Sequence, residues 1–203
     1  MMERIKINAV LVVFLAIFAS CDRDECKNRE YLPAPPNVVN GIPYKDGQVI
    51  RFKTSEGDTI KTFVKHILEI VRPDYPEYCE EVLTINLTEP GKTYTYINFL
   101  TRGSVTSLYN IIQMSIPMGT NGTAGGGGQI ELSDDGSLNQ VPLNGASVFH
   151  PTISLNGLQY ENVVELNLAS GEPGSITKIF YNISTGVIQF STFDGLEVNR
   201  MPG

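Results

Sequence analysis

The side chains in this sequence best suited to chemistry are three cysteines, two histidines and two acidic doublets. The cysteines are Cys21, Cys26 and Cys79. A catalytic site needs a nucleophile with a base, a pair of carboxylates, or metal ligands at usable spacing. His66 and His150 each stand alone, and the chain has no G-x-S-x-G, no HExxH and no Cys-His signature of a thiol protease. We therefore expect both histidines to be structural.

The acidic doublets are also poor catalytic pairs. They are Glu80-Glu81 and Asp134-Asp135. Side chains adjacent on one strand point to opposite faces of a sheet, so two neighbouring carboxylates do not converge on one substrate. A glycosidase brings its carboxylates together from distant strands, so a small secreted hydrolase with a site built from loops stays open as an alternative. The main expectation is that the chain is not an enzyme and holds neither cofactor nor metal.

The N-terminus has the pattern of an export signal. Arg4 and Lys6 precede an uncharged, largely apolar run over residues 9–19, which ends in Ala19-Ser20-Cys21. The run is about half the roughly 20 apolar residues that a membrane-spanning helix needs. A basic start, a short apolar run and small residues at its end are typical of a cleaved signal peptide. We predict that residues 1–20 are removed.

Small residues directly before a cysteine resemble the lipobox of bacterial lipoproteins. Ala19, Ser20 and Cys21 match that pattern, while Phe18 stands where a Leu is usual; Bacteroidetes lipoproteins are looser at this position. The resemblance implies that Cys21 carries a diacylglyceryl group and becomes the first residue of a membrane-tethered mature chain. The alternative is an ordinary secretory signal cut near Ser20. The acidic run over residues 22–25 is similar to an export tag for the outer face of the outer membrane, or is a solvated linker.

If Cys21 is lipidated, two cysteines remain as partners. Export places Cys26 and Cys79 in an oxidising compartment, where a disulfide is favoured. Their bond would close a span of 53 residues. Loss of loop entropy in the unfolded chain would then stabilise the fold by roughly 4 kcal/mol. It would also fasten the mature N-terminus to the domain. Two free buried thiols are the alternative.

Composition is that of a single acidic domain. Residues 21–43, which are acidic and rich in proline, are predicted to form a tether, and residues 44–203 one β-rich globular domain. Without residues 1–20, the 15 basic and 22 acidic residues become 13 and 21, a net charge of −8 with no basic run. Such a chain disfavours nucleic acid. Tryptophan is absent, which argues weakly against aromatic platforms for sugars, although nine tyrosines could substitute.

Short apolar runs separated by turns predict an all-β fold: an antiparallel β-sandwich or a partly open β-barrel, with at most one short helix. Strand patterns cover residues 48–54, 82–87, 94–100, 108–116, 129–132, 176–182 and 187–193. Residues 59–71 fit both a helical stripe and one face of a strand. Their many Thr, Ile and Val residues, which suit a pleated surface, favour the strand.

Two loops have compositions that suggest ligands. The glycine-rich residues 118–128 lack the helix and the Lys-Ser/Thr of a phosphate site, so a flexible hairpin loop is favoured. Residues 133–137 could offer oxygens to calcium but lack the spaced ligands of an EF-hand loop, so an Asp-Gly turn is favoured. Residues 142–151 are predicted to be irregular.

The cleanest alternation lies in residues 158–168, where five apolar side chains are predicted to share one face: Leu158, Tyr160, Val164, Leu166 and Leu168. The run over residues 178–190 has an aromatic pair, a polar turn ending in Gly, and an apolar pair before Phe. It resembles the closing hairpin of many small Bacteroidetes lipoproteins of unknown function. Val198 stands where those proteins often carry a Trp.

These patterns lead to one functional expectation. The chain is expected to be a membrane-anchored lipoprotein that acts as a non-catalytic binding or accessory module at the bacterial cell envelope. Its expected partners are the membrane, through the lipid on Cys21, and an envelope protein or glycan. The expected location is the bacterial outer membrane, on the cell surface or the periplasmic face. The alternatives are a structural or assembly component of the surface and the loop-built hydrolase.

Overall fold

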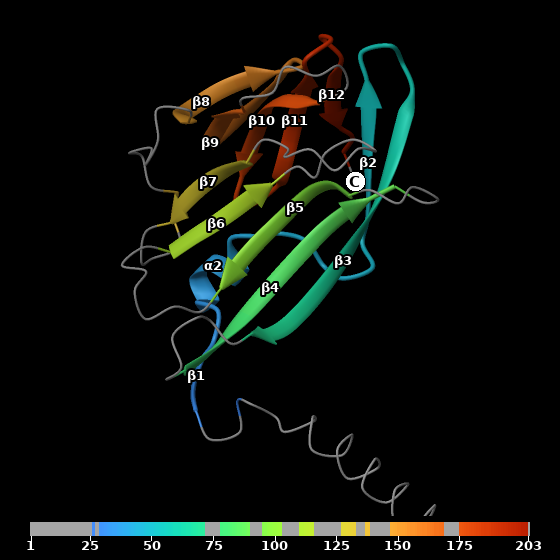
Figure 1. The fold of residues 1–203 in the computed structure, drawn as a ribbon. Helices are drawn as coiled ribbons and strands as arrows, with labels where there is room; N and C mark the ends of the chain where they lie inside the picture. Colours follow the sequence, from blue (N-terminus) through green and yellow to red (C-terminus); the bar gives the residue numbers. More distant parts are fainter. Residues whose placement is uncertain are drawn as a thin grey trace, which may run out of the picture.

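The computed structural model describes residues 26, 29–71, 78–89, 95–102, 110–115, 127–132, 137–138, 147–168 and 175–202. In these residues nearly all regular structure is β, with one short helix, as the sequence predicts. The strands form one twelve-stranded sheet that curls into a nearly closed, barrel-like shape (Figure 1). Of the two architectures expected from the sequence, the barrel is the one observed.

The sheet consists of two meanders joined side by side. The first contains β2 (Val49–Thr54), β3 (Thr59–Val71), β4 (Tyr78–Thr88), β5 (Thr95–Arg102), β6 (Asn110–Ser115) and β7 (Gly127–Leu132). The second contains β8 (Ser147–Leu155), β9 (Leu158–Asn167), β10 (Ile176–Asn182), β11 (Gly186–Thr192) and β12 (Glu197–Arg200). The last strand, β12, pairs antiparallel with β2 and so joins the two. The short β1 (Glu30–Leu32) pairs in parallel with the start of β4.

The barrel comes close to closure where β7 meets β9. Gly128 of β7 packs against Leu166 of β9: a Cβ on residue 128 would lie 3.2 Å from the Leu166 side chain. A glycine in a strand permits this kind of close approach. The ends of the sheet are therefore held together by side-chain packing, with β7 and β8 as the two end strands of the hydrogen-bonded order.

Aromatic side chains fill the interior of the barrel. The rings of Tyr44 and Phe99 have centroids 5.4 Å apart, and those of Phe99 and Tyr181 are 5.8 Å apart. Phe52 and Phe190 form a third contact at 5.6 Å. Tilted and edge-on contacts of this kind stabilise a core beyond the area that they bury.

The prediction that residues 21–43 form a tether is wrong for the part that folds. This stretch contains β1 and the helix α2 (Pro36–Asn40), and Val38 of the helix is fully buried in the core with Ile42 behind it. The prediction took the prolines to block regular structure. Pro36 stands at the start of the helix, where the missing N–H costs no hydrogen bond. The domain therefore begins at β1 and not at residue 44.

A second, smaller apolar cluster lies on the outside of the sheet. Val163, Phe180 and Ile188 are buried there, while their neighbours Val164, Tyr181 and Val187 belong to the interior core. The far half of the β8–β9 hairpin covers this cluster, contributing partly buried side chains: Ile153, Leu155 and Tyr160. The outer cluster thus buries one end of the hairpin against the outside of the barrel.

This arrangement corrects the predicted alternation of residues 158–168. Val164, Leu166 and Leu168 face the interior as predicted, but Tyr160 packs on the outer cluster and Leu158 is half exposed. The strand changes its facing near Asn162, which has a left-handed backbone with φ of 52°. Asn adopts that conformation more readily than most residues, so β9 bends there without a glycine.

The remaining predictions divide three ways. Residues 59–71 form the strand β3, as predicted. Residues 142–151 were expected to be irregular, which is wrong for the part from Ser147, where β8 begins. Most of the glycine-rich loop over residues 118–128, and residues 133–136, lie outside the described residues. No helix among the described residues is long and apolar enough to cross a membrane.

Candidate functional site

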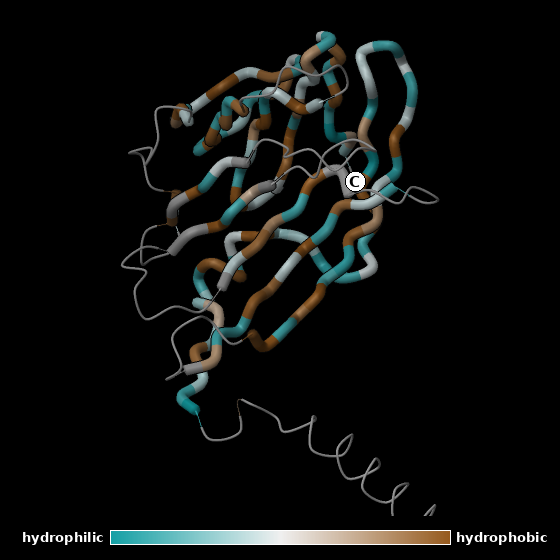
Figure 2. The backbone as a smooth tube through the Cα atoms, in the orientation of Figure 1, coloured by the Kyte–Doolittle hydropathy of each residue, from teal (hydrophilic) through white to brown (hydrophobic). Residues whose placement is uncertain are grey.

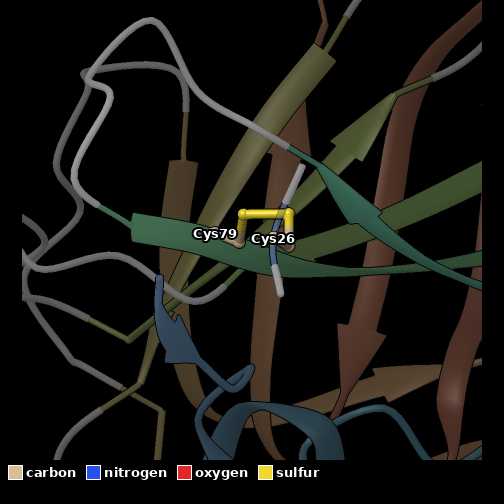
Figure 3. Close-up of a disulfide and its surroundings, with 2 residues drawn as sticks. All are labelled: Cys26 and Cys79. Carbon is tan, nitrogen blue, oxygen red and sulfur yellow. A yellow bond between two sulfur atoms is a disulfide. The ribbon is translucent and has the colours of Figure 1, made fainter. Parts of the chain in front are cut away.

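One end of the barrel carries the disulfide between Cys26 and Cys79, the pairing expected from the sequence (Figure 3). The two Cα atoms are 5.9 Å apart. Cys79 lies at the start of β4, is 1% exposed and is the register partner of Tyr31 in β1. The bond therefore fastens the chain to the sheet only five positions after Cys21. We call this region the anchor end.

A cleft lies under the β8–β9 hairpin at the other end of the barrel. We call it the hairpin cleft; its volume is about 350 Å³. It is lined by Lys53, Thr54, Asn156, Leu158, Tyr160, Ile188, Asn199, Arg200, Met201 and Pro202. In Figure 1 the elements that form it gather at the top of the barrel, while β1 and the start of β4 lie at the bottom.

Three strands bring polar side chains into one row beside this cleft. Asn199 of β12 is the register partner of Lys53 on one side and of Gln189 on the other. Directly opposed residues on antiparallel strands point to the same face. Gln189 also opposes Phe180 of the outer cluster, so the row lies on the outside of the barrel. This row cannot be recognised in the sequence, because its residues come from three strands and lie far apart along the chain.

Two acceptors in this row lack hydrogen-bond partners. The Oδ1 atom of Asn199 and the Oε1 atom of Gln189 are buried and accept no hydrogen bond, and Gln189 is only 6% exposed. Leaving a buried polar atom unpaired costs about 1–3 kcal/mol. Asn86 and Asn98, which oppose each other on β4 and β5, share this feature but do not line the hairpin cleft.

Apolar and aromatic surface lies next to Asn199 in the hairpin cleft, whereas Gln189, its partner on β11, is not part of the lining. Ile188 is almost fully buried, Leu158 is 50% exposed and the ring of Tyr160 is partly buried. The hairpin turns through Asn156 and Gly157, with φ of 50° and 75°, as an Asn-Gly hairpin turn requires. An apolar wall with a few converging polar atoms is the usual make-up of a small-molecule site.

Just beneath the cleft, a buried tyrosine joins the sheet to the chain that follows α2. The hydroxyl oxygen of Tyr44 accepts a hydrogen bond from the Val187 N–H, 2.6 Å away. Burial raises the pKa of Tyr44 to about 12. Gly186, with φ of 82°, leaves room for this hydroxyl, since a Cβ there would lie 2.3 Å from it. The guanidinium of Arg200, a cleft residue, lies 6.0 Å from the centre of the Tyr44 ring.

The structure places His150 in an ion-pair cluster on the outer face. Its Nε2 atom lies 2.9 Å from Glu165 Oε2, and Lys178 Nζ lies 2.8 Å from Glu165 Oε1. Burial opposes the ionisation of Glu165, but hydrogen bonds from Lys178 and His150 outweigh it and lower the pKa of Glu165. The carboxylate is thus held by two partners, an arrangement suited to joining β8, β9 and β10.

His66 and the doublet Glu80-Glu81 are not brought together with that cluster. The backbone N–H of His66 donates to Asp46 Oδ1 at 2.8 Å, and its ring Nε2 is buried without a partner. Glu81 accepts a hydrogen bond from the Tyr31 hydroxyl at the anchor end. The described residues include no group of three or more His, Cys, Asp or Glu side chains placed to hold a metal ion.

Sequence reasoning missed the hairpin cleft. The Asn-Gly pair at 156–157 predicts a tight hairpin, and Asn162 within an alternating apolar segment indicates a bend in the strand. Neither signal shows which surface the hairpin covers. Compared with known proteins, the sequence matches no protein-family model, no curated protein and no solved structure.

Proposed function

We propose that this protein is a lipid-anchored, non-catalytic binding module of the bacterial cell envelope, and that the hairpin cleft is its ligand site. The observation that carries the proposal is a cleft in which Asn199, whose buried Oδ1 has no hydrogen-bond partner, lies beside an apolar and aromatic wall. A ligand with an O–H or N–H donor would complete the hydrogen bonding of Asn199, and an apolar face of it would pack on Tyr160.

The positions of the two ends support an anchored binder. The Cys26–Cys79 bond ties the chain to the sheet close to Cys21, the proposed site of lipidation. The hairpin cleft lies at the other end of the barrel (Figure 1). A protein tethered through Cys21 would therefore hold its cleft away from the bilayer, where a soluble or surface-bound ligand reaches it.

A glycan is the ligand class that fits these groups best. Sugars present several O–H donors and an apolar ring face, which match the acceptors and the tyrosine ring. Lys53, an exposed residue beside Asn199 in the cleft lining, offers an ammonium group that can bind a ring oxygen or a sugar carboxylate. An envelope protein would instead need a wider contact than a cleft of about 350 Å³ offers.

Titration with soluble oligosaccharides tests this proposal. Xylan, cellulose, mannan and chitin fragments are added separately to the mature protein, and the heat of binding is measured. We expect at least one fragment to bind, and Asn199→Ala and Tyr160→Ala each to weaken it by about tenfold, equivalent to about 1.4 kcal/mol.

Asn86→Ala is the matched control, since Asn86 also carries a buried unpartnered Oδ1 but lies outside the cleft. It should bind as the wild type does. Equal weakening by Asn86→Ala and Asn199→Ala would contradict a site in the cleft, and the absence of binding by every fragment would contradict a glycan ligand.

A further inference from the structure

A group of large apolar side chains is exposed at the anchor end. Leu68 is 61% exposed and Ile70 is 57% exposed, both on the last part of β3, and Tyr31 on β1 is 47% exposed. We call these three residues the basal patch. Figure 2 shows the hydrophobic colour of this lower end of β3. Leu68 and Ile70 are the most exposed large apolar residues among those described, and a group of exposed apolar side chains marks a contact surface.

The register places the three side chains on one face. Ile70 opposes Glu81 of β4, and Leu68 opposes Leu83 two residues further along. Tyr31 opposes Cys79, and its hydroxyl donates to the Glu81 carboxylate, which lies on the same face. Opposed residues share a face, as do residues two apart on a strand. Leu83 belongs to the interior core, so the basal patch lies on the inward face of the sheet, where β3 and β4 extend beyond the packed core.

This face is also the face of the disulfide. Cys79 is two residues from Glu81 on β4, so it is the diagonal neighbour of Ile70. Diagonal neighbours on one face lie about 7–8 Å apart. From Cys26, bonded to Cys79, the chain back to Cys21 has five residue steps, which reach at most about 18 Å when fully extended. A lipid on Cys21 would therefore keep the patch close to the bilayer surface.

We infer that the basal patch rests on the bilayer that holds the lipid of Cys21, so that the barrel stands on the membrane by this end. The inference depends on the proposed lipid anchor and adds the surface that touches the membrane. Leu68 and Ile70 would enter the boundary between headgroups and acyl chains. Tyr31, an apolar ring with a polar tip, suits the same depth.

The charges of this end indicate which lipid surface it fits. Glu81 lies within the patch, and Asp22, Asp24 and Glu25 lie between Cys21 and Cys26. Anionic headgroups would repel these carboxylates. The surface that fits is a zwitterionic one, such as phosphatidylethanolamine, where the apolar contact is not opposed by charge.

Tryptophan substitution gives a direct test, because the chain contains no tryptophan. Full-length Leu68→Trp, Ile70→Trp and Phe63→Trp are produced in a bacterium that processes lipoproteins and reconstituted into phosphatidylethanolamine–phosphatidylcholine vesicles, with and without brominated acyl chains. Phe63 is the matched control: it lies on β3 and is 42% exposed, but far along the strand from Ile70. Exposed strand positions accept tryptophan well.

We expect tryptophan at 68 and 70 to emit at shorter wavelength on vesicles and to lose intensity on brominated lipid, while tryptophan at 63 keeps its emission in water. Equal emission at all three positions on protein that floats with the vesicles would overturn the inference and leave the anchor intact. Shielding from acrylamide without quenching by brominated lipid would also overturn it, because a second protein copy would then cover the patch. Wild-type protein that fails to float would overturn the anchor and the inference together.

Discussion

The anchor end and the hairpin cleft differ in how they are held together. At the anchor end a covalent bond joins Cys26 to a cysteine that is 1% exposed, beside a patch of exposed apolar side chains. At the cleft a bent hairpin is held by apolar packing and hydrogen bonds, and leaves polar acceptors unpaired. At the first end the disulfide holds the chain that leads back to Cys21 covalently to the sheet. At the second end two buried acceptor atoms have no hydrogen-bond partner.

Breaking the covalent bond should have the largest effect on stability. Cys79→Ser is expected to lower the free energy of unfolding by about 2–5 kcal/mol, the usual loss for a native disulfide. Chemical denaturation of the oxidised protein measures it. Cys26→Ser should lose a similar amount, since it removes the same bond. If both cysteines were found as free thiols in freshly purified wild-type protein, the claim that a covalent bond holds the anchor end would be wrong.

Removing the tyrosine hydroxyl beneath the cleft should have the next largest effect. Tyr44→Phe leaves the buried Val187 N–H without its acceptor, which costs about 1–3 kcal/mol. The loss of stability should be measured at neutral pH by denaturation and compared with the disulfide variants.

Tyr44 also predicts a pH dependence. The pKa of Tyr44 is raised from 10.0 to about 12 in the fold, chiefly by burial. The unfolded chain therefore ionises first, so the stability due to the neutral phenol is complete below pH 10 and falls as pH rises toward about 12. Tyr44→Phe should show a shallower loss over that window. An unchanged slope would contradict the buried, neutral state of Tyr44.

The bend in β9 gives a third, smaller effect. Asn162 has φ of 52°, and a β-branched residue in that conformation costs about 1–2 kcal/mol. Asn162→Val should lose about that much, while Asn162→Gly should stay near the wild type, because glycine adopts positive φ freely. Thermal unfolding of the two variants measures the difference. Equal stability of both would mean that the bend is not set at this residue.

The ion pair on the outer face should matter least. Glu165→Gln is expected to cost about 0.5–1 kcal/mol, the range of partly exposed pairs. Because the pKa of Glu165 is lowered below 4.5, its contribution is present above that pH and is lost as pH falls through the folded value. Acid titration of stability checks this. Glu161→Gln, an exposed glutamate on the same strand, should change nothing; a matching loss there would point to a general charge effect.

The all-β fold could be predicted because turn residues and β-branched residues act locally. The ambiguous residues 59–71, rich in Thr, Ile and Val, became β3 for that reason. The pairing of Cys26 with Cys79 followed from the lipobox resemblance. The helix α2 was missed because the prolines before it were taken as blocking helix, whereas the burial of Val38, a tertiary effect, stabilises it.

The hairpin cleft could not be predicted because its parts meet only after folding. Lys53, Asn199 and Gln189 come from three strands, and their row depends on the pairing of β12 with β2. The bend at Asn162 then decides which face Tyr160 covers. The basal patch was hidden for a similar reason, since an alternation within β3 does not tell which residues lie beyond the packed core.

The roles proposed for the anchor end and the hairpin cleft both depend on lipidation of Cys21. Metabolic labelling tests this lipidation most directly. Cells expressing the full-length protein are grown with an alkyne fatty acid, and the protein is purified and coupled to a reporter dye. We expect labelling of the wild type and of Cys79→Ser, because the disulfide takes no part in the proposed anchor, and no labelling of Cys21→Ala. Equal labelling of Cys21→Ala and wild type, or an unlabelled wild type, would contradict it.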